Sequence, residues 1–176
     1  FKTPTVNTLA SYPYLVLKDI KSAYPLTVVN VINTSIGGEN SESGLKRFES
    51  DVLTHKPDVL FIDYALNDRG MGLERAKIAW EKMIRLALDK NIKVILLTPS
   101  PDQRVDIKDE FSILDQHANQ IKQIAKSFQI GLIDTYALYK NKVKSGHNLI
   151  DYMSQVNHPN EKGHQMITDE IMSYFK

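Results

Sequence analysis

Hydrophobic positions along this chain follow two periods, one typical of helices and one typical of buried strands. Apolar residues recur every three or four positions in several stretches, which predicts amphipathic helices. The expected helices cover residues 12–24, 44–53, 73–90, 112–128 and 160–174. Between them lie shorter runs rich in β-branched and apolar residues, which predict strands at residues 27–36, 57–66, 93–100 and 131–138.

Strands that alternate with helices of this length indicate an α/β sandwich with a parallel sheet. We therefore expect a three-layer α/β/α fold in a single domain, residues 1–176, since this length fits one domain. Sites in such folds gather at the carboxyl ends of the strands. The loops that follow the expected strands, and the loop before the last helix, are therefore the places to search.

Composition and charge exclude several kinds of site. The chain has no cysteine, which excludes disulfides, thiolate metal sites and cysteine nucleophiles. Its formal net charge is +1, with acids and bases interspersed, which argues against nucleic acid as a partner. No apolar run approaches the length of a membrane span. The cofactor motifs GxGxxG and GKS or GKT, and the nucleophile elbow GxSxG, are all missing from the sequence.

Two glycines, Gly37 and Gly38, follow the first expected strand in the stretch TSIGGENSESG. Glycines at this place let the backbone turn sharply and leave amide N–H groups that can hold an anion or a developing oxyanion. An ordinary strand-to-helix turn, with Ser41 or Ser43 as the helix cap, explains the same residues. Taken alone, the stretch favours that ordinary turn.

Asn67 and Asp68 follow the second expected strand in the stretch DYALNDRG. The side chain of Asn67 can donate a hydrogen bond into the crevice at the end of the sheet, and Asp68 can fix the loop by accepting from backbone amides. A turn capped by this Asn-Asp pair is an equally good interpretation when the stretch is considered by itself.

His158 and His164 lie close together in the stretch SQVNHPNEKGH. Pro159 biases His158 towards an extended conformation, so we expect His158 on a loop that faces the crevice, where a general base would stand. His164 falls inside the last helix and lacks the i, i+4 spacing of a zinc pair, so we interpret it as a packing residue. His117 is predicted to lie on a helix surface.

Together, these stretches resemble the active-site blocks of the SGNH hydrolases, also called the GDSL family of esterases and acylhydrolases. IGGENS matches the second block, ALND matches the G-x-N-D of the third, and HPNEKG matches the fifth, in the family's order and across essentially the whole chain. The resemblance implies a flavodoxin-like parallel sheet with strand order 2-1-3-4-5. It also implies that His158 is the catalytic base, that the Gly38 amide and the Asn67 side chain hold the oxyanion, and that no metal or cofactor is needed.

The chain departs from the family pattern at three places. Ala65 replaces the glycine of the third block, which is a small-for-small change. Gln155 stands three residues before His158, where the family usually places its acid, so Gln155, a backbone carbonyl or Asp151 remain open as the group that orients the imidazole. The Gly-Asp-Ser of the first block, which carries the nucleophilic serine, does not occur in the chain.

The missing first block has a structural implication, because in the family it ends the first strand, which lies inside the sheet. We therefore expect the four strands counted here to match the family's second to fifth, Phe1 not to be the biological start, and residues 1–176 alone to be inactive. The resemblance implies hydrolysis of a carboxylic ester through an acyl-enzyme, with acetyl esters of carbohydrates as the first expectation. A non-catalytic carbohydrate- or ligand-binding relative is the alternative. The sequence leaves oligomeric state and localisation open, and a periplasmic or secreted location is compatible with it.

Overall fold

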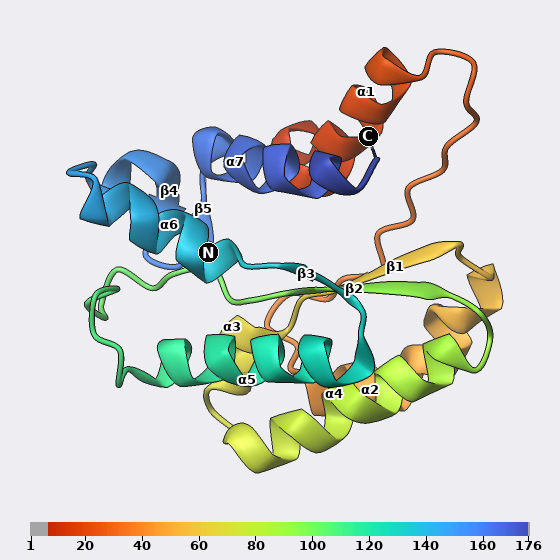
Figure 1. Ribbon diagram of the computed structural model, residues 1–176, viewed down its shortest axis with the longest axis horizontal. Helices are drawn as coiled ribbons and strands as arrows, with labels where there is room; N and C mark the ends of the chain where they lie inside the picture. The colour runs from red at the N-terminus through yellow and green to blue at the C-terminus, as the bar shows by residue number, and fades with distance from the viewer. Residues whose placement is uncertain (1–6, 176) are drawn as a thin grey trace.

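The computed structural model describes residues 7–175 and has a parallel sheet at its centre. The sheet has three strands in the order β1-β2-β3, namely β1 (Val59–Ile62), β2 (Lys93–Leu97) and β3 (Gly131–Ile133). Helices α2, α4 and α5 cover one face, and α1, α6 and α7 lie on the other side (Figure 1). The predicted α/β sandwich is therefore confirmed.

Five of the six longer helices, all except α6, agree closely with the hydrophobic pattern. The longer ones are α1 (Tyr12–Ala23), α2 (Ser41–Asp51), α4 (Leu73–Leu88), α5 (Ile113–Phe128), α6 (Thr135–Lys144) and α7 (Glu161–Ile171). The shorter ones are α3 (Ala65–Asp68) and the 3-10 turns η1 (Thr8–Ala10), η2 (Leu53–His55), η3 (Leu149–Tyr152) and η4 (Met172–Phe175). A separate antiparallel hairpin is formed by β4 (Met153–Gln155) and β5 (His158–Pro159). Among residues 7–175, no helix is long and apolar enough to cross a membrane.

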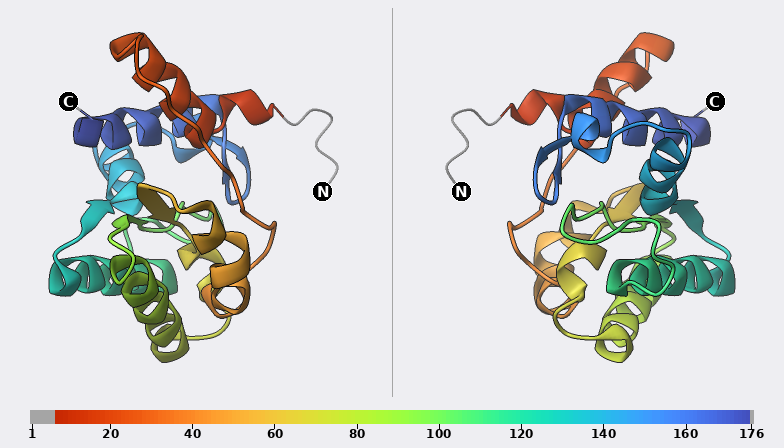
Figure 2. Two further views of the ribbon diagram at one scale, coloured as in Figure 1. Left: turned by 90° about the vertical axis from the view of Figure 1, so that its right-hand side faces the viewer. Right: turned by 90° about the vertical axis from the view of Figure 1, so that its left-hand side faces the viewer.

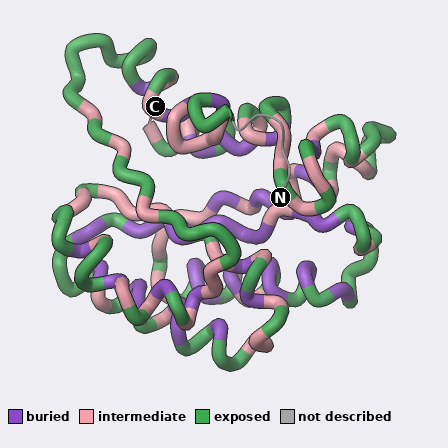
Figure 3. Tube along the Cα trace, turned by 180° about the vertical axis from the view of Figure 1, so that it is seen from behind, coloured by how far each residue is buried: buried purple, intermediate pink, exposed green. Residues whose placement is uncertain are grey.

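Strand β2 lies at the centre of the core. Val94 and Leu96 pack into the hydrophobic cluster under α4 and α5, while Ile95 and Leu97 pack into the cluster under α1 and α7. All four side chains are buried, because successive residues of a strand point to opposite faces and both faces are covered (Figure 3). This explains why the sequence of β2 is a continuous apolar run.

The strand predicted at residues 27–36 is wrong, because this segment forms no strand in the structure. It runs as an extended, mostly exposed connection from α1 to α2 along one side of the molecule (Figure 2). Leu26 and Val28 are 99% and 88% exposed. Within the described part of the chain, β1 pairs with β2 alone, so its other edge is open. β-branched residues favour a strand only where a neighbouring strand can bond to them, and residues 27–36 have none.

Three other predicted strands are shorter than expected. β1 ends at Ile62 and β2 ends at Leu97, and the chain then turns into loops that carry polar residues. β3 ends at Ile133 because Asp134 begins a helix, α6, which the hydrophobic pattern did not predict. The Asp134 side chain accepts a hydrogen bond from the amide of Ala137, and such a cap stabilises the first helical turn.

Candidate functional site

Gly38 forms a tight turn directly before α2. The Glu39 amide donates to the Ile36 carbonyl at 3.2 Å, and Gly38 has φ +78°, a left-handed conformation that favours glycine. A Cβ atom at Gly38 would meet no neighbour within 4 Å, so the backbone conformation, rather than lack of space, is what requires glycine. Among residues 7–175, the Gly38 amide has no hydrogen-bond acceptor and remains available to a ligand.

Asn67 lies in the short helix α3 and reaches the Gly38 turn. Its Nδ2 donates to the carbonyl of Glu39, the residue after Gly38, at 2.9 Å. A side-chain amide nitrogen carries two hydrogens, so this bond fixes the orientation of the group and leaves a second N–H for a ligand. The structure thus brings Asn67 next to the Gly38 turn.

Asp68 connects α3 to the start of α2 from the interior of the protein. Its buried carboxylate accepts from the amide of Ser41 at 2.7 Å and from Nε1 of Trp80 at 2.6 Å. The prediction that Asp68 bonds a backbone amide is confirmed, but that amide belongs to the first residue of α2 and not to the loop of Asp68 itself. Asn40 caps α2 by accepting from the amide of Ser43, so the interpretation that Ser41 or Ser43 is the cap is wrong.

His117 was predicted on a helix surface, and this is wrong. The residue is 1% exposed and lies near Asp68, on the face of α5 that packs towards α3. Burial lowers the pKa of His117, and the nearby carboxylate only partly opposes that effect. Burial likewise raises the pKa of Asp68, against the hydrogen bonds that it accepts. Asp68 thus supports the start of α2 from inside the protein, and His117 is buried near it.

His158 lies in β5 of the small hairpin, and not in an irregular loop as expected. It keeps the extended conformation that Pro159 favours, is exposed, and pairs with Gln155 of β4. Asn160 then caps α7 by accepting from the amide of Gly163 at 3.1 Å. A Cβ atom on Gly163 would lie 2.5 Å from the carbonyl oxygen of Tyr152, so glycine lets α7 begin close against η3.

His164 has the geometry of a packing residue. Its Nδ1 accepts a hydrogen bond from the amide of Tyr12 at 3.3 Å, and the two rings are in contact. The pKa of His164 is lowered from 6.5 to about 4, chiefly by burial and also by neighbouring His158. The two histidines are therefore close in space, but only His158 is exposed.

This lowered pKa predicts a loss of stability in acid. The unfolded chain binds a proton at His164 more readily than the folded protein does. The contribution of neutral His164 to the unfolding free energy is therefore present above pH 6.5 and is lost as the pH falls towards 4. We expect the wild type to lose roughly 2–3 kcal/mol more unfolding free energy than His164→Gln between pH 7 and pH 4. Urea unfolding at both pH values measures this difference. The exposed His147→Gln is the control, and equal losses in wild type and His164→Gln would contradict the prediction.

The loop after β2 contains site contacts that the sequence motifs did not reveal. Asp102 forms an ion pair with Arg69, and Gln103 bonds to the hairpin that carries His158. The only signal in the sequence is that polar, oppositely charged residues follow two neighbouring strands, in NDRG and in SPDQR. Among residues 7–175, no group of three His, Asp, Glu or Cys side chains could hold a metal ion.

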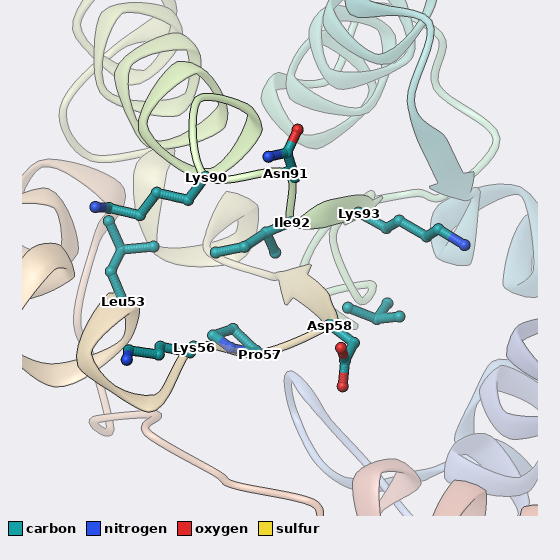
Figure 4. A pocket seen from close by; sticks show the side chains of 9 residues that line it. Leu53, Lys56, Pro57, Asp58, Lys90, Asn91, Ile92 and Lys93 are labelled. Carbon is teal, nitrogen blue, oxygen red and sulfur yellow. The ribbon is translucent and has the colours of Figure 1, made fainter.

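A cavity of about 570 Å³ lies at the opposite end of the sheet, where β1 and β2 begin (Figure 4). Its wall includes Lys56, Asp58, Lys90 and Lys93. None of the candidate site residues lines this cavity, and ligands of parallel sheets bind at the carboxyl ends of strands. The candidate functional site is therefore the pair of segments around Gly38 and Asn67.

Comparison with protein families identifies the family to which the chain belongs. Residues 3–166 match the model of the GDSL-like lipase/acylhydrolase family. The chain belongs to this family. The resemblance found in the sequence motifs is thereby confirmed. As a GDSL-like hydrolase, the chain is 23% identical over 160 residues to an acetylxylan esterase from Geobacillus stearothermophilus, a match that covers 84% of this chain and 73% of that protein.

Solved structures show the same fold. The acetylxylan esterase structure from Geobacillus stearothermophilus superposes with a TM-score of 0.83 at 22% identity, covering 93% of this GDSL-like chain and 80% of the other. The acetyl xylan esterase AlAXEase superposes with a TM-score of 0.80 at 22% identity, covering 97% and 93% of the two chains. These likenesses establish the architecture of the α/β sandwich.

Proposed function

We propose that the protein is a serine esterase that removes acetyl groups from carbohydrates. The observation that carries the proposal is the joined pair of loops at the end of β1. There the unbonded Gly38 amide and the oriented Asn67 amide form two donors that an oxyanion requires. The names of the relatives, acetylxylan esterases, support acetyl as the acyl group and a carbohydrate as the alcohol.

In the proposed reaction, His158 takes the proton of a serine hydroxyl as its oxygen attacks the ester carbonyl. The carbonyl oxygen becomes an oxyanion that accepts from the Gly38 amide and from Nδ2 of Asn67. The intermediate collapses, the C–O bond to the sugar breaks, and His158 gives its proton to the departing hydroxyl. Water then attacks the acyl-serine with the help of His158, releasing acetate and restoring the serine.

The serine is proposed to lie on a strand that pairs with the open edge of β1. Within residues 7–175, that edge has no partner strand, and residues 27–36 extend beside the sheet with exposed apolar side chains. A strand inserted between them would satisfy the backbone groups of both segments. On this proposal, residues 1–176 alone lack the attacking atom and are inactive.

The group that orients His158 differs from that of the relative. Catalytic mutants of the Geobacillus esterase replace a serine, an aspartate or a histidine, and that aspartate stands three residues before the histidine. Here the matching residue is Gln155, which is partly buried and pairs with His158 across the hairpin. We propose that the amide oxygen of Gln155 or a backbone carbonyl orients the imidazole, with exposed Asp151 as the alternative.

The acetyl preference is tested with the full-length protein that carries the serine. Acetate should be released from p-nitrophenyl acetate and from acetylated xylo-oligosaccharides faster than octanoate is released from p-nitrophenyl octanoate. Faster release of the long-chain acid would contradict the substrate proposed here. Residues 1–176 on their own serve as the control without the nucleophile.

A non-catalytic carbohydrate-binding protein is the second candidate, and the lack of a Gly-Asp-Ser sequence in residues 1–176 favours it. Calorimetric titration with acetylated xylo-oligosaccharides separates the two. If the full-length protein binds these oligosaccharides but releases no acetate, the carbohydrate-binding function is supported and the esterase function is excluded.

A further inference from the structure

The loop after β2 contacts one side of the site through Asp102. Its side chain is 1% exposed and forms an ion pair with Arg69, which follows Asn67 and Asp68 at the end of α3. The same carboxylate accepts from the amide, Nε and Nη2 of Arg104, at 3.0, 2.9 and 2.6 Å. These bonds hold the pKa of Asp102 well below its usual range, so the carboxylate stays charged. A charged, fully bonded carboxylate holds the loop firmly against α3.

The next residue of the same loop, Gln103, contacts the other side of the site. Its amide donates to the carbonyl of Val156 at 2.8 Å, and its Nε2 donates to the carbonyl of Gln155 at 2.9 Å. Gln155 ends β4, and Val156 begins the two-residue turn that leads to His158. Both bonds end on the hairpin backbone, so they fix the position of the whole hairpin and not only one side chain.

Two adjacent residues therefore join segments that are far apart in the sequence. Asn67 belongs to α3 and His158 belongs to the hairpin, and these two segments lie on opposite sides of the sheet (Figure 1). We infer that Asp102 and Gln103 are positioning residues that set the distance between His158 and the oxyanion donors Gly38 and Asn67. This inference rests on the proposed esterase function. A misplacement of about 1 Å in such a site can lower the rate about a hundred-fold, so the link controls turnover.

The inference is tested in the full-length protein with Gln103→Ala and Asp102→Asn. With p-nitrophenyl acetate, we expect kcat to fall about tenfold for Gln103→Ala and about a hundred-fold for Asp102→Asn, with KM changed less than about threefold. Gln116→Ala is the matched control, because the Nε2 of Gln116 also donates to a backbone carbonyl, that of Phe111, without reaching the hairpin. Unchanged kcat in both test variants, or an equal loss in Gln116→Ala, would overturn the inference.

Amide hydrogen exchange supplies a readout that does not depend on turnover. Residues 153–159 should exchange faster in Gln103→Ala than in the wild type or in Gln116→Ala, while α4 and β2 keep their protection. If the hairpin exchanges at the wild-type rate, Gln103 does not hold it and the inference fails. If the wild type shows no turnover at all, the proposed function fails, and the exchange rates still decide whether Gln103 anchors the hairpin.

Discussion

Replacing His158 by alanine should lower kcat for p-nitrophenyl acetate by about a thousand-fold in the full-length protein, since general acid–base catalysis contributes about 10²- to 10⁴-fold. Without the imidazole, the serine hydroxyl has no group to take its proton, and the departing alcohol has none to give it one. Steady-state kinetics at pH 8 measure the effect.

The control for this prediction is His147→Ala, because His147 is exposed and lies outside the candidate site. That variant should keep the wild-type kcat. Equal rates for wild type and His158→Ala would show that His158 takes no part in the mechanism. Thermal unfolding checks that His158→Ala and His147→Ala are both folded.

Replacing Asn67 by alanine should lower kcat by about a hundred- to a thousand-fold, which is the usual loss when one oxyanion donor is removed. KM should change little, because the interaction is stronger in the transition state than in the bound ester. Asn148→Ala is the control, since Asn148 is exposed and its side chain makes no capping bond. A raised KM with unchanged kcat would show instead that Asn67 only binds the substrate.

The predicted helices could be recognised because each one buries a regular stripe of apolar side chains. In α4, the side chains of Ala76, Trp80, Met83 and Ala87 are all at most 1% exposed, and their spacing is visible in the sequence. The strand predicted at residues 27–36 failed for the opposite reason. A strand requires hydrogen bonds to another segment. β-branched residues indicate a preference for the extended conformation, but they do not show whether a partner strand is present.

The two sides of the candidate site differed in how far they could be predicted. Asn67 follows the end of β1 and Gly38 precedes α2. The short motifs around both residues imply their role without knowledge of the tertiary structure. The contacts of Asp102 with Arg69 and of Gln103 with Val156 span 33 and 53 positions, and no local pattern encodes them. The burial of His117 likewise depends on which face of α5 meets α3.

The open edge of β1 has a consequence for handling the protein. An unpaired strand edge is a row of amides and carbonyls that can bond to the same edge of another molecule. Beside it, residues 27–36 add exposed apolar side chains. A preparation in which nothing covers this edge should therefore associate with itself as concentration rises, and light scattering before crystallisation or kinetics will report whether the edge has been closed.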